Sequence, residues 1–410
     1  MAACRPGSEA PAVPAERVLR FQADGASHPQ ASERGDFVVR ELLDGLSHPW
    51  GLAFLPDGAM LVTERPGRLH RIAADGTITT LLDDVPRLFM RGQSGVLDVA
   101  VSPRFAEDRL VYVSYGESNL RGNKGGTAVA RARLEGDRLG ALEVIFRQEP
   151  KLSNSSHIGS RLAFDGRGYL FVSAGDNRDS GKAQLLDHLQ GKVVRLHVDG
   201  RVPDDNPFVG RADARTEIWS YGHRNIQGMA MHPTSGQLWT HEHGPFGGDE
   251  INLAQAGLNY GWPLATHGRE YSGEKVPEAV GTHAPGTQPP HHYWQVSPAL
   301  SGMAFYTGEV FPQWRGNLFI GAMAGQRLIR LELDGDRIVH EEGLLTDLGE
   351  RIRDVRMGPD GYLYLLTDDA ANGRLLRLEP AAAMSSGEGP AVETPAGDLP
   401  AVETAEKPAA

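Results

Sequence analysis

Residues 161–176 read RLAFDGRGYLFVSAGD: an apolar run, a turn that contains Asp and Gly, and a second apolar run. Two such runs around a short turn are typical of a β-hairpin. The pattern recurs along the chain in six copies, which begin at Gly51, Val96, Arg161, Gly228, Gly302 and Asp354. A unit that recurs in this way predicts a repeat architecture, in which each copy packs against its neighbours.

Several copies are followed by a second pair of strand-like runs with its own turn, at residues 67–82, 191–202 and 326–339. Each repeat then supplies about four strands, which form the blade of a β-propeller. A sandwich or a single barrel would need fewer strands and would not repeat. We therefore predict an all-β protein folded as a six-bladed β-propeller. The copies lie about 45 to 75 residues apart, longer than a minimal blade, which predicts inserted loops.

The composition agrees with short strands joined by turns, because the 410 residues include 50 Gly and 27 Pro. A net charge of −12 disfavours nucleic acid and anionic membranes as partners, since both are negative. Cys4 is the only cysteine of the sequence, so neither an intrachain disulfide nor a cysteine-based metal site is possible. No segment approaches the roughly 18 apolar residues that a membrane span needs.

The two ends of the chain differ from its middle. We predict a flexible segment over residues 1–36, the propeller domain over residues 37–380, and a disordered tail over residues 381–410, which is rich in Pro, Ala and Glu. Ala2-Ala3-Cys4 resembles the end of a bacterial lipoprotein signal, but the apolar region that precedes such a cysteine is missing. A lipoprotein tether and an arbitrary N-terminus are both open interpretations.

His157 stands at the entry of the third repeat, after the small polar residues SNSS. An imidazole at a blade end can act as a base near neutral pH. Asp176 ends the same hairpin, where its carboxylate can orient such a base. The structural alternatives are a histidine hydrogen-bonded in a turn and a carboxylate that caps a turn.

Guanidinium and amide groups gather at other blade ends. Arg224 is followed by Asn225, and the spacing of Arg351 and Arg353 places both side chains on one face of a strand. Gln93 lies in a glycine-flanked loop before the second repeat. Parallel guanidinium groups suit a ligand with several carboxylates or phosphates. Surface salt bridges are the alternative for the same arginines.

A further stretch favours a hard cation. The turn at residues 243–245, His-Gly-Pro, exposes successive backbone carbonyls, and Asp249 and Glu250 follow it. Oxygen ligands are therefore concentrated, as Ca²⁺ requires. Zinc at His241 and His243 is disfavoured, because two histidines at alternating strand positions without a third fixed ligand are usually packing or surface residues.

Together these segments resemble the soluble PQQ-dependent aldose sugar dehydrogenases of the glucose/sorbosone dehydrogenase family. The resemblance covers roughly residues 37–380 and is carried, in order, by HPWGLAFLPDG, GQSGVLDVAVSP, HIGSRLAFDGRGYLFVSAGD, YGHRNIQGMA, HGPFGGDEINL, GLNYGWP and RIRDV. It implies a six-bladed propeller, the fold that the repeats predict independently. It also implies an enzyme that oxidises an aldose at its anomeric carbon to a lactone, with hydride transfer to pyrroloquinoline quinone (PQQ) and onward electron transfer to an external acceptor.

The resemblance implies roles for single residues. His157 would be the catalytic base, and Asp176 the carboxylate held against it. The residues that would hold PQQ are Gln93, Arg224, Asn225, Arg351 and Arg353. The expected Ca²⁺ ligands are the carbonyls of Gly244 and Pro245 in the active site, with Glu250 and Tyr260 at a further, structural ion.

One position departs from the family pattern. Ala324 stands where the family usually has Lys, which should weaken cofactor binding unless Arg327 reaches in from the adjacent turn. A calcium-dependent lactone hydrolase and a non-catalytic binding propeller are the alternative functions, and the hydrolase leaves the arginines unexplained. The expected location is periplasmic or on the outer surface, with Cys4 as a candidate lipid anchor.

Overall fold

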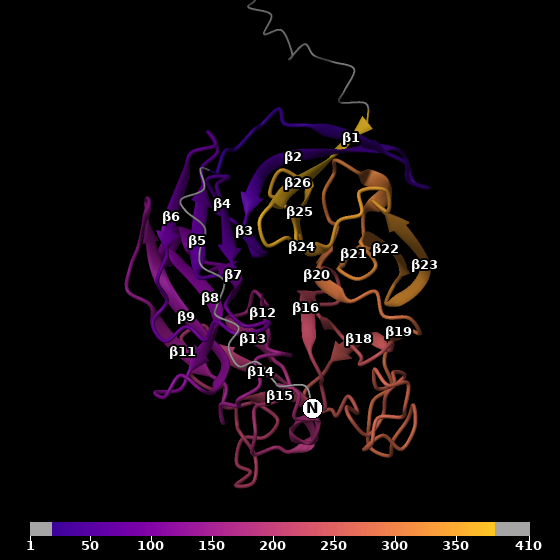
Figure 1. Cartoon of the computed structure of the whole chain (residues 1–410). Helices are drawn as coiled ribbons and strands as arrows, with labels where there is room; N and C mark the ends of the chain where they lie inside the picture. Colours follow the sequence, from indigo (N-terminus) through magenta and orange to yellow (C-terminus); the bar gives the residue numbers. More distant parts are fainter. Residues whose placement is uncertain (1–18, 382–410) are drawn as a thin grey trace, which may run out of the picture.

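In the computed structural model, which describes residues 19–381, 26 β-strands form six antiparallel sheets around one axis (Figure 1). The prediction of an all-β, six-bladed propeller is confirmed. Helix within the described residues is limited to α1 (Phe105–Asp108) and two 3₁₀ turns, η1 (Ser180–Gln184) and η2 (Pro312–Trp314). None of the helices in this part of the chain is long and apolar enough to cross a membrane.

The six repeated hairpins are the inner halves of the blades. Their first strands line the axis: β3 (Pro49–Phe54), β7 (Val96–Val101), β12 (Gly159–Phe164), β16 (Ile226–Met231), β20 (Leu300–Phe305) and β24 (Ile352–Met357). Each of them contacts the next one, and β24 contacts β3, which closes the ring. Their antiparallel partners are β4 (Met60–Glu64), β8 (Leu110–Ser118), β13 (Tyr169–Ala174), β17 (Leu238–Glu242), β21 (Leu318–Ala322) and β25 (Leu363–Thr367).

The outer strands complete the sheets. They are β5 (Arg68–Ile72), β6 (Ile78–Leu82), β9 (Gly125–Glu135), β10 (Arg138–Leu139), β11 (Glu143–Arg147), β14 (Lys192–His197), β15 (Ile218–Tyr221), β18 (Asp249–Ala254), β19 (His292–Trp294), β22 (Arg327–Asp334) and β23 (Arg337–Leu344). The predicted outer pairs over residues 67–82 and 326–339 are confirmed. The pair predicted over residues 191–202 is wrong, because Pro203 follows the turn and β14 pairs instead with β15, after an inserted loop.

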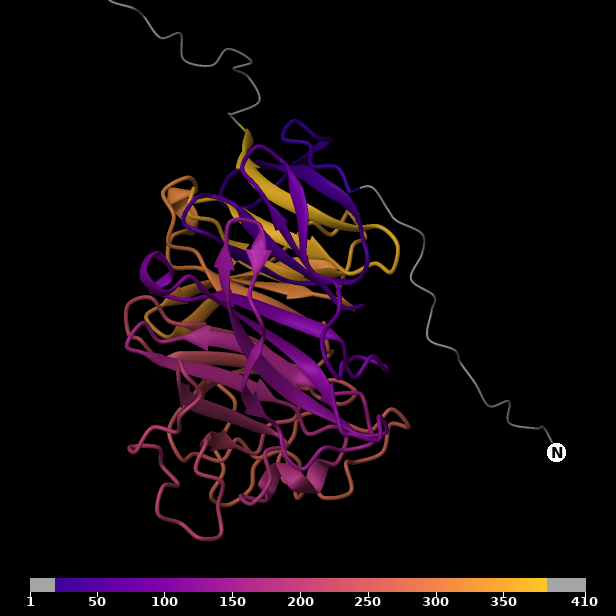
Figure 2. The ribbon, with the colours of Figure 1, turned by 90° about the vertical axis from the view of Figure 1, so that its left-hand side faces the viewer.

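The sixth sheet joins the two ends of the described chain. The strand β2 (Phe37–Leu46) pairs with β26 (Gly373–Pro380), and Figure 2 shows the indigo and yellow segments side by side. Residues 19–36 are not the flexible segment that the sequence predicts. Instead β1 (Ser27–Gln30) pairs with β2, and the Gln30 side chain donates a hydrogen bond of 2.9 Å to Asp347. Residues 1–18, with Cys4, and residues 382–410 lie outside the described residues.

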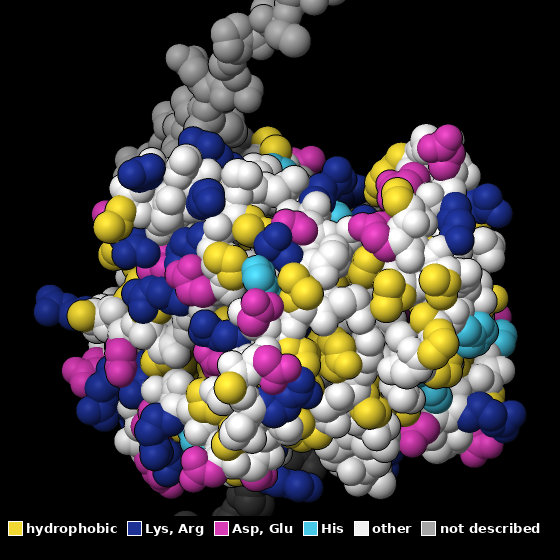
Figure 3. All heavy atoms as spheres, turned by 90° about the horizontal axis from the view of Figure 1, so that it is seen from below, with side chains coloured by type: hydrophobic (Ala, Val, Ile, Leu, Met, Phe, Trp, Pro, Cys, Tyr) yellow, Lys and Arg dark blue, Asp and Glu magenta, His cyan; other side chains and the backbone are white. Residues whose placement is uncertain are grey.

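Apolar side chains fill the spaces between neighbouring sheets. Trp314 of the turn η2 and Phe319 of β21, both in the fifth blade, pack with Phe37 and Leu365 of the sixth, and each of these four side chains is fully buried. Burial of such layers holds the blades face to face. On the face seen in Figure 3, acidic and basic side chains are interspersed.

Candidate functional site

One end of the ring collects residues from every blade. Each inner hairpin is antiparallel, so the residue before its first strand and the residue after its second strand lie at the same end. The residues before the first strands include Gln93, His157, Asn225 and Arg351, and those after the second strands include Arg65, Asp176, His243 and Asp368. The propeller thus brings together side chains that are far apart in the sequence.

A cavity of about 290 Å³ lies at this end. Four of the five predicted PQQ ligands line it together: Gln93, Asn225, Arg351 and Arg353. The other lining residues are Trp50, Arg65, Leu97, Ile158, Gly159, Gln227, His243, Ala299, Met323 and Asp368. The cavity therefore has contributions from all six blades.

The charge inside the cavity is unbalanced. Three guanidinium groups, those of Arg65, Arg351 and Arg353, face the single carboxylate of Asp368. Asp368 lies 3.4 Å from Arg351 and 3.3 Å from Arg353, and its other oxygen is 3.0 Å from Nδ1 of His48. Burial would raise the pKa of Asp368, but the hydrogen bond with His48 and the arginine charges outweigh it and hold that pKa well below its usual range. Burial lowers the pKa of Arg353 to about 10. The arrangement favours an anionic ligand.

His157 and Asp176 form a buried pair beside this cavity. Nδ1 of His157 lies 2.7 Å from Oδ1 of Asp176, and Oδ2 of Asp176 accepts a hydrogen bond of 2.8 Å from Nε1 of Trp262. Both oxygens of the carboxylate are thus engaged, which fixes the plane of the imidazole. Trp262 follows Tyr260-Gly261 in the loop after β18, so the blade-four insertion supports a pair that belongs to blade three.

The backbone holds His157 in an uncommon conformation, with a φ of 53° in the left-handed region. Its amide donates a hydrogen bond of 2.8 Å to Oε1 of Gln93, and this contact ties the histidine to the cavity wall. Burial lowers the pKa of His157, although the hydrogen bond with Asp176 opposes the shift. A neutral imidazole with an oriented ring can accept a proton at its other nitrogen, Nε2.

Arg224, the fifth predicted PQQ ligand, connects the pair with the cavity rather than lining it. Its carbonyl accepts a hydrogen bond of 2.8 Å from the amide of Asp176, and its Nη1 donates one of 3.0 Å to the carbonyl of His243. Its guanidinium lies 5.2 Å from the centre of the Trp262 ring. Burial lowers the pKa of Arg224.

The predicted calcium turn directly follows His243, which lines the cavity. The amide of Gly244 donates a hydrogen bond of 3.0 Å to Oδ1 of Asp249, which stabilises the turn. Among the hydrogen bonds of residues 19–381, none ends on the carbonyl oxygen of Gly244 or Pro245. Nor do three His, Cys, Asp or Glu side chains converge as metal ligands anywhere in this range. A cation held here would depend on backbone oxygens.

Glu250 and Tyr260, predicted at a second calcium site, lie apart from the cavity. Glu250 is the cross-strand partner of Glu242 in the β17–β18 pair, and Asn252 donates a hydrogen bond of 2.9 Å to Glu250. Burial and the charge of Glu242 raise the pKa of Glu250 well above its usual range. The hydroxyl of Tyr260 donates to the carbonyl of Leu253 and accepts from the amide of Gln255, so the Tyr260 carbonyl is the better candidate for a ligand beside Glu250.

The fifth blade offers the cavity no cation. Ala324 is exposed, and its amide donates a hydrogen bond of 3.0 Å to the carbonyl of Pro298. Arg327 does not reach in as a substitute, because it lies 3.5 Å from Glu341 of the outer strand β23. Arg65 of blade one supplies a guanidinium group to the cavity instead.

Sequence reasoning missed Arg65, Asp368, Trp50 and Gln227. A single charged residue after a strand looks like ordinary turn chemistry. Arg65 and Asp368, however, follow the second strands of their hairpins, as Asp176 does in blade three. Superposing the six repeats by position in the hairpin would have found both.

The comparisons with known proteins agree with this arrangement. A family model described as Glucose / Sorbosone dehydrogenase matches residues 46–377. The chain belongs to this family. Among the members of the glucose/sorbosone dehydrogenase family, it is 52% identical over 345 residues to aldose sugar dehydrogenase YliI of Escherichia coli (strain K12), and the match covers 83% of this chain and 92% of that protein.

Solved structures of similar proteins share the fold. The soluble aldose sugar dehydrogenase of Escherichia coli in its apo-form matches with a TM-score of 0.81 at 52% identity, over 83% of this chain and 99% of that chain. The PQQ-bound form of aldose sugar dehydrogenase from Streptomyces coelicolor matches with a TM-score of 0.66 at 28% identity, over 88% of this chain and 100% of that one.

Proposed function

We propose that the protein is an oxidoreductase that oxidises aldose sugars at the anomeric carbon to lactones, with PQQ and Ca²⁺ as cofactors and an external electron acceptor. The observation that carries this proposal is the cavity in which three guanidinium groups outnumber one carboxylate, beside a buried His157–Asp176 pair. The sugar dehydrogenase names of the relatives and the PQQ-bound structure from Streptomyces coelicolor support it.

The residues present fit PQQ. It is an ortho-quinone with three carboxylates, and arginines pair with carboxylates through charge-assisted hydrogen bonds. Nε of Arg353 and Nε of Arg224 are buried and have no hydrogen-bond partner among the described residues. Unsatisfied buried donors cost free energy unless a ligand or water fills them. Gln93, Asn225, Arg351 and Arg353 would hold the group in the cavity, with Arg224 at its edge.

The residues also fit Ca²⁺. The carbonyls of Gly244 and Pro245 accept no hydrogen bond within residues 19–381, and carbonyl oxygen is a ligand that Ca²⁺ prefers. We assign these two carbonyls to the active-site ion. Glu250, together with the Tyr260 carbonyl, would hold the structural ion near the paired carboxylate of Glu242.

When bound, PQQ would supply the two-electron oxidant that takes the hydride, and Ca²⁺ the Lewis acid that polarises its carbonyl. The protein supplies the proton acceptor and the orientation. His157 accepts the proton of the anomeric hydroxyl at Nε2, because Nδ1 is committed to Asp176. Asp176 stabilises the imidazolium that forms, and Trp262 keeps the carboxylate in place.

Substrate, location and acceptor follow from the same proposal. An aldose would enter from the open end of the ring, and its electrons would leave to an acceptor outside the protein. The location is periplasmic or on the outer surface. Lipid anchoring at Cys4 is a further part of the proposal and concerns a residue outside the described range.

The test is a titration of the apo-protein with PQQ and Ca²⁺ that is monitored by visible absorbance. Glucose and a dye acceptor are added after the titration. We expect saturable PQQ uptake and sugar-dependent dye reduction. PQQ uptake without dye reduction over a panel of aldoses would contradict the proposed reaction. Lactone hydrolysis by the cofactor-free protein would favour a hydrolase instead, and no effect of either cofactor on thermal stability would favour a binding propeller.

A further inference from the structure

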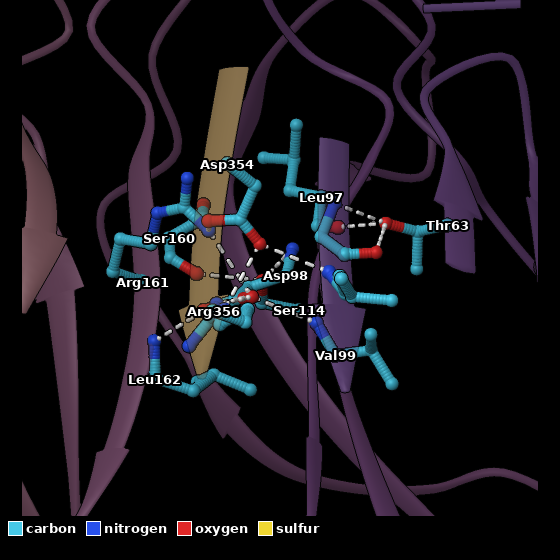
Figure 4. A network of polar contacts seen from close by, with 12 residues as sticks. Thr63, Leu97, Asp98, Val99, Ser114, Ser160, Arg161, Leu162, Asp354 and Arg356 are labelled. Atoms are coloured by element: carbon cyan, nitrogen blue, oxygen red, sulfur yellow. Dashed lines mark hydrogen bonds and ion pairs between the residues drawn. The ribbon is translucent and has the colours of Figure 1, made fainter. Parts of the chain in front are cut away.

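A buried cluster of two carboxylates and two guanidinium groups joins three of the inner strands, and Figure 4 shows its side chains directed toward one another. Asp98 comes from β7, Arg161 from β12, and Asp354 and Arg356 from β24. Nη1 of Arg161 lies 3.3 Å from Asp98 and 3.0 Å from Asp354. Arg356 lies 2.7 Å from Asp98 and 2.9 Å from Asp354. Both arginines thus bridge the same two carboxylates.

The cluster is balanced in charge, and backbone amides of β12 and β3 donate to its carboxylates. Asp98 accepts a hydrogen bond of 2.9 Å from the amide of Leu162, and Asp354 accepts one of 2.9 Å from the amide of Leu52. Both carboxylates are fully buried. A buried ion cluster is costly to break, because removal of one partner leaves an uncompensated charge.

The two arginines differ in what else they contact. Arg161 donates from Nε to the carbonyl of Gln227, at 2.6 Å, and from Nη2 to the carbonyl of Arg353, at 3.2 Å. Its guanidinium carbon also lies 4.0 Å from the centre of the Trp50 ring. Gln227, Arg353 and Trp50 all line the cavity assigned to PQQ. Arg356 makes none of these contacts and instead lines a separate, largely apolar cavity of about 430 Å³, together with Phe54.

We propose that Arg161 is a positioning residue for the cofactor site. Arg161 is anchored by the carboxylates of Asp98 and Asp354. From there it fixes the relative positions of three parts of the cavity wall: the Trp50 ring and the backbones of Gln227 and Arg353. Because Nη1 of Arg353 lies 3.5 Å from the side-chain oxygen of Gln227, a shift of either backbone would displace both side chains. This inference rests on the proposed function, since it concerns residues that would hold PQQ.

The physical basis is the fork of the guanidinium group. Five N–H donors in one plane let Arg161 satisfy two carboxylates on one side and two carbonyls on the other. The cation also stacks on the indole of Trp50. Lysine has the same charge but cannot reach four acceptors in fixed directions. Arg161→Lys should therefore preserve the charge of the cluster but no longer fix the relative positions of the cavity-wall residues.

The experiment compares Arg161→Met with Arg356→Met as a matched control. Each substitution removes one guanidinium from the same pair of carboxylates and leaves the same net charge. We expect similar falls in Tm. The Kd for PQQ, measured by absorbance titration in the presence of Ca²⁺, should rise at least about tenfold for Arg161→Met and less than about threefold for Arg356→Met. The intrinsic fluorescence of the apo-protein should change more in Arg161→Met, because Trp50 loses the nearer of its two guanidinium neighbours, Arg161 at 4.0 Å rather than Arg353 at 5.9 Å.

Equal rises in the Kd for PQQ in the two variants would overturn the inference, because the effect would then be general loss of stability. If Arg161→Met does not fold, Arg161→Lys replaces it: we expect a weaker Kd at near-native Tm, and a native Kd would contradict the proposal. The two proposals fail separately. A wild-type protein that takes up no PQQ refutes the cofactor assignment, whereas uptake with indistinguishable variants refutes only the role of Arg161.

Discussion

Two buried histidine–carboxylate pairs lie in neighbouring blades, and they differ in whether the second ring nitrogen, Nε2, has a hydrogen-bond partner. His157 has Nδ1 at 2.7 Å from Asp176, and its Nε2 makes no hydrogen bond or ion pair within residues 19–381. His223 has Nδ1 at 2.8 Å from Glu242, but its Nε2 lies 2.9 Å from Oγ of Ser220, and its ring stacks on Tyr260 at 4.8 Å. The same pair of groups is thus suited to proton transfer in one blade and to structural support in the other.

The largest effect should come from removal of the first histidine. In His157→Ala we expect kcat to fall by about 10² or more, because no other base stands at that position. The absorbance titration should show PQQ uptake close to that of the wild type. A variant that loses uptake and turnover to the same extent would show that His157 belongs to the binding wall and is not the base.

Asp176→Asn should reduce kcat by about tenfold to hundredfold, because an amide neither favours the required tautomer nor stabilises the imidazolium. The KM for the sugar should change little, since Asp176 reaches the substrate only through His157. A rise in KM with an unchanged kcat would instead indicate that the carboxylate contacts the sugar.

The pH dependence of kcat/KM follows from the lowered pKa of His157. The neutral ring is the active form, so the rate should fall by about tenfold per pH unit below that pKa. Burial lowers the pKa of His157, so the acid limb of the pH profile should lie below pH 6.5, the ordinary histidine pKa. Asp176 favours the protonated ring, so the limb should move to still lower pH in Asp176→Asn. A limb that does not move would separate the titrating group from this pair.

The smallest effect on turnover should come from the second histidine. His223→Ala leaves the buried Glu242 without its imidazole partner, and we expect a loss of about 1 to 3 kcal/mol in the free energy of unfolding. Because Nε2 of His223 is already engaged by Ser220, the fall in kcat should be at least tenfold smaller in His223→Ala than in His157→Ala. Denaturant unfolding of the two alanine variants, measured side by side with kcat, checks both expectations.

The inner hairpins were readable from the sequence because each combines apolar runs with a Gly, Pro or Asp turn. The strand β15 was not, since an inserted loop separates it from its partner β14. The strand β1 was missed for another reason: SHPQ carries no apolar alternation, and it is held by pairing with β2. Long-range pairing of this kind leaves no local signal.

The candidate site was predictable only in part. Motifs indicated His157 and the arginines of blades four and six, and the structure brings them to one end of the ring. Arg65 and Asp368 carry no motif, and their importance comes from their place in the hairpin. The contacts of Arg161 could not be anticipated, because they depend on how five inner strands meet at the axis.

The seam between β2 and β26 has a consequence for how the protein is made. The sixth sheet cannot be completed until β26 (Gly373–Pro380), the last strand of the described residues, has been synthesised and has paired with β2, which is made near the start. Until then β2 presents an open edge, and the blade that carries Arg351 and Arg353 is incomplete. A nascent chain that stops before Gly373 would therefore hold most of the propeller strands, yet the blade that carries Arg351 and Arg353 would lack one of its strands.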